Sequence, residues 1–404
     1  MRNSRARAGT PTPPLESLER EDLSDLERIR QVSSVVARPR VGQPNSFVLH
    51  APLELTARAS LLALARPGMR AAIRDRIASI ADEYESFGPA RPEPSEASPS
   101  TASRSRSGTA ATPEALLQAV VEGDPDRAEA EVLACSGHVA ATEIARALTE
   151  PVLSMQAAAA HAPILLGDLE RDQTGLFPLD LLRPAVRLLA NRDFARIDWF
   201  EDLDLDRPAN ASRLESALWN IERLGPPEEG NIPAHLARAA EALRHEGPVV
   251  EALGEPDRAA WLAVLRVAAR SMVFEGAAQA PYLWSHCLTL PLSVMRLAHH
   301  CRDQARALAI AATHVVSYRT CHAKGEPQPS DRFESAATVD LARWSDLIDE
   351  AGAHRDAHVA KYANACLQAA AIDPEQSGLY LAAGERLLAV WRAKDADGIP
   401  PGAR

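Results

Sequence analysis

Apolar residues recur at three- and four-residue spacing along almost the whole chain, and this period constrains the fold more than any other feature. Such spacing places the apolar side chains on one face of an α-helix. The apolar residues are mostly Ala and Leu, which favour helices, whereas only 4% of all residues are aromatic. No run of alternating β-branched residues is long enough for a sheet. We therefore predict an all-α fold.

The period is interrupted by Gly, Pro and polar residues, which predict the ends of successive helices. The predicted helices cover residues 17–31, stretches that begin at 52 and 68, and then 113–135, 138–150, 151–171, 178–191, 209–223, 231–245, 256–276, 279–298, 302–322, 333–350, 355–371 and 374–393. The helices within 17–87 are too few to form a core of their own, so they should pack on a main body that spans 114–393. We expect a single large multi-helix bundle or array.

One internal stretch differs from the rest in composition. Residues 88–113 read GPARPEPSEASPSTASRSRSGTAATP and contain no large apolar side chain. A segment of this kind cannot contribute to a packed core, so we predict a flexible, disordered insertion. Residues 1–16 are expected to form a disordered N-terminus, and residues 394–404 a tail.

Charge and cysteine content exclude several classes of partner. The net charge is -11, and no concentrated basic run is present, which argues against nucleic acid. No window reaches about eighteen uninterrupted apolar residues, so no membrane span is expected. The five cysteines are an odd number without a CxxC pair, which makes a disulfide framework unlikely to be the organising feature and favours a reducing compartment. We predict a cytoplasmic protein whose partner is a small-molecule substrate; the oligomeric state is open.

Most familiar catalytic signatures are missing from the sequence. There is no GxGxxG after a strand, no GxxxxGK[ST] phosphate loop, no HExxH and no GxSxG. No histidine has an acidic residue three positions before it, which excludes the Glu-x-x-His pairs of di-iron bundles. CxxCH is also missing, so covalent haem attachment is excluded. The remaining candidates are individual histidines.

Three histidines lie in similar contexts: His50 in FVLHAPLEL, His161 in AAAHAPILL and His286 in LWSHCLTLPL. In each case a proline follows, and proline favours the first turn of a helix or bends one. Imidazole suits proton transfer near neutral pH and metal ligation. We predict that His50, His161 and His286 converge in one cavity as catalytic residues. The competing interpretation is three core histidines whose nitrogens are satisfied by neighbouring groups.

Further candidates have weaker patterns. Tyr282, Trp284 and Tyr318 would line an aromatic substrate pocket, unless they are ordinary core residues. His354 and His358 are four residues apart, a helical spacing able to hold a metal, although a solvated helix face gives the same pattern. His314 shares a helix face with Tyr318 and His322, which is more typical of a core. The adjacent pair His299 and His300 is expected to be solvated.

The order of these segments resembles the questin oxidase-like family. The matching residues are His50-Ala51-Pro52 followed by LLALARPG, the segment from His161 to Gly167, and the segment from His286 to Pro291. Near the C-terminus, the stretch from His358 to Lys361 is similar to a His-x-x-Lys element of the same family. The chain departs from that pattern at Leu49 and in its 88–113 insertion.

The resemblance implies an oxidoreductase, a monooxygenase that opens a ring by Baeyer–Villiger-type chemistry on a small aromatic or polyketide-like molecule of secondary metabolism, with NADPH as reductant. No flavin site is visible in the sequence, so a metal or haem held by histidine is an alternative means of oxygen activation. Two other functions stay open: a non-enzymatic helical scaffold or ligand-binding protein, and a metal enzyme that uses His354 and His358.

Overall fold

A computed structural model describes residues 24–41, 49–93, 111–154, 161–172, 175–191, 196–228, 232–243, 247–275, 281–324 and 340–396 of the chain. Within these ranges the regular elements are helices, accompanied by two isolated bridges, Arg40–Ala90 and Pro208–Glu255. The predicted all-α fold is confirmed. Residues 1–16, most of the predicted insertion and residues 397–404 lie outside the described ranges.

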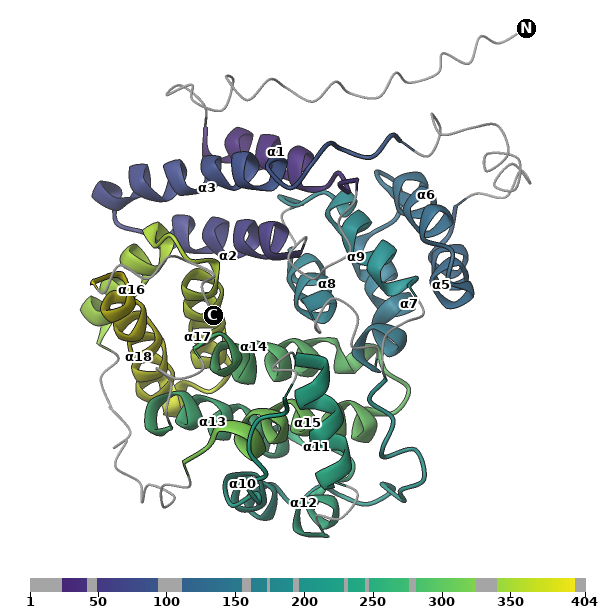
Figure 1. Cartoon of the computed structure of the whole chain (residues 1–404), viewed down its shortest axis with the longest axis vertical. Coiled ribbons are helices and arrows are strands. Elements are labelled where there is room, and N and C mark those ends of the chain that lie inside the picture. The colour runs from purple at the N-terminus through teal and green to yellow at the C-terminus, as the bar shows by residue number, and fades with distance from the viewer. Residues whose placement is uncertain are drawn as a thin grey trace, which may run out of the picture.

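The first half of the chain forms two groups of helices (Figure 1). α1, α2 and α3 lie together at one end, beside a second group made of α5 to α9. Their bounds are α1 Asp25–Val36, α2 His50–Leu64, η3 Pro67–Met69, α3 Arg70–Glu85, α5 Pro113–Glu122, α6 Pro125–Cys135, α7 Ala141–Ser154, α8 His161–Arg171, η5 Leu179–Leu182 and α9 Arg183–Leu189.

The second half completes the array at the opposite end and along one side (Figure 1). Its helices are α10 Ala211–Trp219, α11 Ile232–Leu243, α12 Gly247–Ala252, α13 Arg258–Phe274, α14 Pro281–Leu297, η6 Ala298–His300, α15 Gln304–His322, α16 Leu341–Ala353, α17 Ala357–Ile372, η7 Pro374–Gln376 and α18 Ser377–Ala396. Four helices from both halves contact one another in a closed sequence: α2 touches α17, α17 touches α14, α14 touches α8, and α8 touches α2.

Local sequence explains where several helices begin and end. The predicted helix 113–135 is in fact two helices, because Gly123 adopts a left-handed conformation (φ 76°) that ends α5. Asp124 then caps α6 by accepting a hydrogen bond from Arg127 N, and Pro125 occupies the first turn. A glycine C-cap followed at once by an Asp-Pro start is a common helix–helix junction. The single-helix prediction was wrong at this point.

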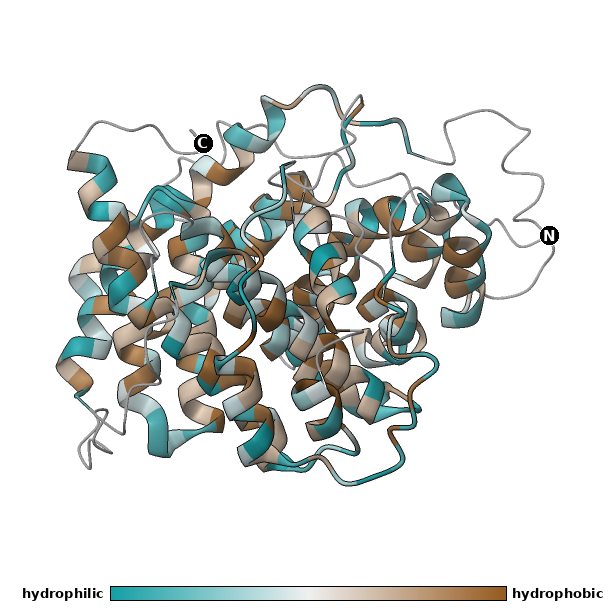
Figure 2. Cartoon of the chain, turned by 60° about the horizontal axis from the view of Figure 1, so that its bottom comes forward, coloured by the Kyte–Doolittle hydropathy of each residue, from teal (hydrophilic) through white to brown (hydrophobic). Residues whose placement is uncertain are grey.

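The outer helices are amphipathic, and Figure 2 shows hydrophobic and hydrophilic residues interleaved along them. α15 is different, because almost every residue from Ala305 to Cys321 is buried. A helix that is buried all round lies in the interior of a large helical protein. None of the described helices combines the length and the apolarity that crossing a bilayer requires.

A buried ion-pair network ties α2 to the C-terminal end of α16. The Arg58 guanidinium pairs with Glu54 at 2.6 Å and donates to the carbonyl oxygens of Gly352 and of His354, the latter at 2.6 Å. These carbonyls end a helix, where a cation is favourable. Gly352 is required by packing, since an added Cβ would lie 2.6 Å from Ile73 Cδ1. This network fixes α2, and with it the position of His50.

The start of the predicted insertion is attached to the folded body. Arg91 N donates to Pro39 O at 2.7 Å, and Val41 N donates to Pro89 O at 2.8 Å. Glu93 pairs with the buried Arg183 at 3.1 Å. Residues 88–93 therefore run alongside the end of α1, whereas residues 94–110 lie outside the described ranges.

Candidate functional site

The four mutually contacting helices each contribute one histidine to a closed ring of imidazoles. His50 is the first residue of α2, His161 is the first of α8, His286 lies within α14, and His358 is in the first turn of α17. The ring centroids are 4.7 Å apart for His50–His161, 4.7 Å for His161–His286, 5.6 Å for His286–His358 and 4.9 Å for His358–His50. The three predicted rings do meet, but of the three only His286 lines the neighbouring cavity, so their convergence in one cavity is confirmed only in part. Their catalytic role stays a prediction.

The His-Ala-Pro tripeptides explain how two of the rings are placed. Pro52 and Pro163 each stand in the first turn of a helix, where a missing N–H costs nothing. The prediction that His50 and His161 stand at helix entrances is therefore confirmed. Pro291 lies inside α14 and leaves the carbonyl of Cys287 without its usual helical donor. His286 sits one residue before that carbonyl, in the middle of the helix.

Three of the four imidazoles are held in the neutral state. Burial lowers the pKa of His50 and of His286 well below 6.5, and the positive charge of Lys361 lowers both further. Burial and the Lys361 charge also lower the pKa of His358 to about 4, against the opposing effect of Asp356. His286 Nδ1 is buried and has no hydrogen-bond partner among the described residues. A neutral imidazole with a free nitrogen can accept a proton.

Asp356 orients the fourth histidine. Its carboxylate accepts from His358 Nδ1 at 3.0 Å and from His358 N at 2.8 Å, so the ring proton resides on Nδ1. Burial opposes ionisation of Asp356, but the hydrogen bonds from His358 and the Lys361 charge outweigh it and lower its pKa to about 2. Tyr282 donates to the same carboxylate at 3.5 Å, and its ring centroid lies 4.5 Å from that of His358.

Lys361 lies one turn after His358 on α17 and faces the same region. Its side chain is buried, with 7% of the residue exposed, and Nζ has no hydrogen-bond partner in the described part of the chain. Burial lowers its pKa from 10.5 to about 8, against the opposing charges of Asp356 and Glu54. A buried ammonium without acceptors is costly, and such groups gather at functional sites.

A small cavity, part of it open to solvent, adjoins the ring, and its volume of about 20 Å³ leaves room for roughly one water molecule. His286 and Lys361 both line it, so the unpartnered imidazole nitrogen and the unpartnered ammonium belong to groups that border the same space. The other lining residues come from the same four helices: Leu53, Ala57, Ile164, Asp168, Ser285, Thr289, Leu292, Ser293, Arg296, Asn364, Ala365 and Gln368. The lining resembles a small-molecule site in chemistry, with apolar walls and a few polar groups, but a ligand larger than water would require these walls to move apart.

Three polar lining residues sit on successive turns of α14. Ser285, Thr289 and Ser293 donate their hydroxyl hydrogens to backbone carbonyls within the helix, at 2.6 to 3.1 Å. Their oxygens keep lone pairs that can accept hydrogen bonds. Asp168 accepts from Thr56 at 2.8 Å, which leaves its second oxygen facing Arg296 at 3.9 Å.

The aromatic candidates are only partly in the predicted place. Tyr282 packs against His358 and Trp391, next to the ring. Trp284 and Tyr318 are fully buried but do not line the cavity. His314 is likewise buried within α15, and burial lowers its pKa to about 3. These three residues lie in the core of the array, as their helical spacing also allowed.

His354 and His358 do not form the predicted i,i+4 pair on one helix. α16 ends at Ala353, with His354 as its C-cap, and α17 begins only at Ala357. His354 Nδ1 accepts from Asp356 N at 3.0 Å, and its Nε2 lies 3.4 Å from Asp395. The prediction that His354 and His358 share one helix face was therefore wrong, because one helix ends and the next begins between them.

Sequence reasoning missed the residues that tune the ring. Asp356 is the N-cap of α17, and an Asp two residues before His358 is a recognisable capping signal. Asp168, Arg296 and Asn364 became visible only through the packing of α8, α14 and α17. Lys361 was singled out by resemblance alone, although lysine is rare in this chain and here stands in the apolar stretch HVAKY.

The ring itself offers no obvious place for a metal or a haem. Within the described ranges, three His, Cys, Asp or Glu ligand atoms approach within 4.8 Å of one another only at Glu170, His299 and His300. The four rings also pack against one another, with no gap between neighbouring rings for a macrocycle. The ring is thus better suited to hydrogen bonding and proton transfer.

Comparisons with known proteins add no assignment to this geometry. No protein-family model, no curated protein and no solved structure matches the chain. The family resemblance seen in the sequence stays a prediction, and the function has to be argued from the site.

Proposed function

We propose that this chain is an enzyme that carries out proton-transfer chemistry on a small aromatic or polyketide-like molecule bound in the cavity beside the histidine ring. The reaction class we propose is oxidative, as in the questin oxidase-like family that the sequence resembles. The observation that supports the proposal most strongly is the buried Lys361 ammonium, which borders the cavity without an acceptor. A ligand that enters the cavity would supply that acceptor.

Lys361 and His286 have complementary roles in this proposal. Lys361 has a pKa of about 8, so most of it carries a proton at neutral pH and can donate to a ketone oxygen. His286 is neutral and has a free Nδ1, which can take up a proton from the same ligand. Insertion of oxygen beside a ketone needs a peroxide-level oxidant, for which dioxygen supplies the oxygen and NADPH two electrons, with the second oxygen atom leaving as water. It also needs a donor that polarises the carbonyl and a base, the roles proposed for Lys361 and His286.

The rest of the ring positions these two groups. His358, fixed by Asp356, and His50 both lie near enough to Lys361 to respond to its charge. Keeping these imidazoles neutral limits the positive charge beside the ammonium, so Lys361 stays protonated near neutral pH. The apolar walls, among them Leu53, Ile164 and Leu292, suit an aromatic ligand.

The lining of this cavity does not suit NADPH, which the resemblance implies. The cavity has only two cationic side chains, Lys361 and Arg296, and Arg296 already faces Asp168. A dinucleotide needs a larger and more basic binding site for its phosphates, such as a glycine-rich turn at a helix N-terminus. NADPH therefore stays a prediction without assigned residues.

The proposal is tested by turnover of a panel of hydroxylated quinones and aromatic ketones, with NADPH and dioxygen supplied. Products one oxygen atom heavier than the substrate are followed by mass spectrometry. We expect Lys361→Met and His286→Gln each to lower kcat by roughly 10²–10⁴-fold, the usual contribution of a positioned acid or base. Lys324→Met, at an exposed lysine, is the matched control and should keep full activity.

A ligand-binding protein without catalysis is the second candidate, because edge-to-face packing of the imidazoles is also a stable structural arrangement. Calorimetry with the same panel separates the two functions. A ligand that binds without turnover, and whose affinity is unchanged in His286→Gln, would favour the non-enzymatic function over the oxidase.

A further inference from the structure

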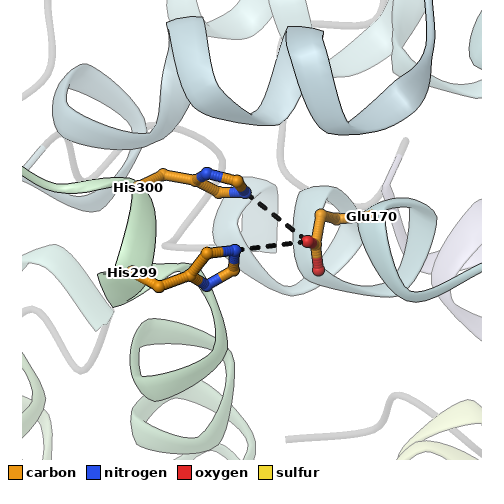
Figure 3. A group of neighbouring side chains, drawn as sticks. All are labelled: Glu170, His299 and His300. Atoms are coloured by element: carbon orange, nitrogen blue, oxygen red, sulfur yellow. Dashed lines mark ion pairs between the residues drawn. The ribbon is translucent and has the colours of Figure 1, made fainter.

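A second group of imidazoles lies outside the cavity, where the C-terminal turn of α8 meets η6. Glu170 projects from α8 towards His299 and His300, and both rings point at its carboxylate (Figure 3). His299 Nε2 and His300 Nε2 each lie 3.5 Å from Glu170 Oε1. The sequence predicted that both histidines are solvated; His299 is exposed (57% of its side chain), but only 7% of the His300 side chain is.

The two ring nitrogens that face Glu170 are available as ligands. His299 Nδ1 lies 2.7 Å from the carbonyl oxygen of Arg296, and since a carbonyl can only accept, Nδ1 carries the ring proton. Its Nε2 lone pair is therefore directed at Glu170. Metal-binding histidines are commonly oriented by this kind of hydrogen bond from the second nitrogen. His300 Nε2 is buried and makes no hydrogen bond with any described residue.

The spacing of these atoms fits a shared ion better than a direct hydrogen bond. A nitrogen and an oxygen 3.5 Å apart are at the limit of hydrogen bonding. Two metal–ligand bonds of about 2.1 Å that meet at a tetrahedral angle separate their ligand atoms by about 3.4 Å. Both pairs have this separation, and the ligand atoms of all three residues lie within 4.8 Å of one another.

We propose that Glu170, His299 and His300 bind a divalent transition-metal ion of the zinc class. Two imidazoles and one carboxylate are a donor set that zinc accepts, and three protein ligands leave a fourth position for water. The exposure of His299 gives that position access to solvent. The ion would join the end of α8 to the turn that follows α14, the two helices that carry His161 and His286.

The test uses the full-length chain, stripped of metal with a chelator and titrated with Zn²⁺ by calorimetry. We expect one ion per chain. Glu170→Gln and His299→Ala should each weaken binding by more than about a hundredfold, because loss of groups that merely orient a ligand already costs about 10–100-fold. The matched control is His138→Ala, at an exposed histidine on a different turn, and it should bind as the wild type does.

Cobalt gives a second readout. Co²⁺ in place of Zn²⁺ should produce the visible absorption of a protein-bound ion, and Glu170→Gln, which keeps the shape of the side chain, should abolish it. Binding that is as tight in Glu170→Gln and His299→Ala as in the wild type would show an adventitious ion only and would overturn the proposal. Turnover in the cavity is a separate measurement, so this outcome leaves the proposed function untouched.

Discussion

Two buried cations in this protein have opposite surroundings. Arg319 in α15 and Lys361 in α17 are 1% and 7% exposed. The Arg319 guanidinium donates to Leu218 O at 2.9 Å, Trp219 O at 2.5 Å and Ser271 Oγ at 2.8 Å, faces Glu275 at 3.3 Å, and lies 3.9 Å from the Trp219 ring centroid. Lys361 Nζ has no hydrogen-bond partner anywhere in the described ranges.

The difference indicates that the Arg319 charge stabilises the fold, whereas the Lys361 charge is better explained by a role in binding or catalysis. Burial of an ion is tolerated when hydrogen bonds and an opposite charge replace water, as they do around Arg319. Lys361 has no hydrogen-bonded acceptor among the described residues, and the charges of Asp356 and Glu54 do not offset the cost of burying its ammonium. A residue that costs stability at a cavity wall is better explained by what it does to a ligand.

Removal of the satisfied cation should have the largest effect on stability. We expect Arg319→Met to lower the free energy of unfolding by about 3–5 kcal/mol, because Glu275 loses its counter-ion and two backbone carbonyls lose their donor in the core. Urea denaturation followed by circular dichroism measures the loss. The double variant Arg319→Met/Glu275→Gln should recover part of it. If Arg319→Met lowers the free energy of unfolding by less than about 1 kcal/mol, Arg319 does not stabilise the fold as proposed and no longer differs from Lys361 in this respect.

Removal of the Lys361 ammonium, which has no hydrogen-bond partner, should raise the free energy of unfolding rather than lower it. The pKa of Lys361 falls from 10.5 to about 8 on folding, so the ammonium costs up to about 3 kcal/mol below pH 8. Since the unfolded chain holds this proton up to a higher pH, the penalty fades as pH rises from 8 to 10.5. Lys361→Met should therefore be more stable than the wild type at pH 7, with an advantage that shrinks by pH 10.

Urea melts of both proteins at pH 7 and pH 10 give this difference directly. Lys324→Met is the matched control, because the exposed side chain should leave stability nearly unchanged at either pH. If Lys361→Met is less stable than the wild type at pH 7, the ammonium has partners that stabilise it, and the comparison with Arg319 fails.

Removal of one histidine from the ring predicts a smaller effect at acidic pH, about 2 kcal/mol between pH 6.5 and 5. The pKa values of His50, His286 and His358 are all lowered by burial, the last to about 4. Below pH 6.5 the unfolded chain takes up protons that the folded chain does not, so stability is fully present above pH 6.5 and is lost as pH falls towards 4. Each such histidine contributes about 1.4 kcal/mol per pH unit.

His286→Gln checks this slope, because it removes one titrating group and keeps a polar side chain. Between pH 6.5 and 5, its stability should fall less steeply than that of the wild type, by the equivalent of about one proton. Identical slopes for the two proteins would mean that His286 is already protonated in the folded state, which contradicts its assigned role as a base.

The smallest effect is expected at an exposed cation. Arg343 pairs with Glu385 on the surface, where the side chains are 52% and 34% exposed. Arg343→Ala should cost only about 0.2–1 kcal/mol, because water screens the pair. The measurement is a double-mutant cycle with Glu385→Ala in the same urea assay. If the coupling energy between Arg343 and Glu385 were as large as the loss of stability in Arg319→Met, burial would not decide how much each cation contributes to stability.

The helices were predictable because their signals are local. The period of Ala and Leu and the capping residues Thr112 and Asp257 mark helices that the structure contains. The break at Gly123 was missed although Gly123-Asp124-Pro125 is a local stop-and-start signal, because the apolar period continues on both sides of it. The shared helix face of His354 and His358 was wrong for another reason: His354 is the extended C-cap of α16, and Asp356 is the N-cap of α17.

The site was predictable only in part, because its geometry depends on contacts between distant helices. His-Ala-Pro marked the helix entrances of His50 and His161, and these two rings do meet. No local pattern shows that α17 brings His358 and Lys361 to the same place, more than 300 residues after His50. The missing acceptors of Lys361 follow from packing on four helices, which the sequence of any one helix does not encode.

The most direct test of the account is an NMR pH titration of the chain labelled with ¹³C at lysine Cε. The chain has only Lys324, Lys361 and Lys394, so the Lys361 signal is the one that disappears in Lys361→Met. We predict that this signal titrates near pH 8. A signal that shows no transition below about pH 10, the ordinary value for lysine, would mean that the ammonium is solvated or paired, and would contradict the proposed role of Lys361.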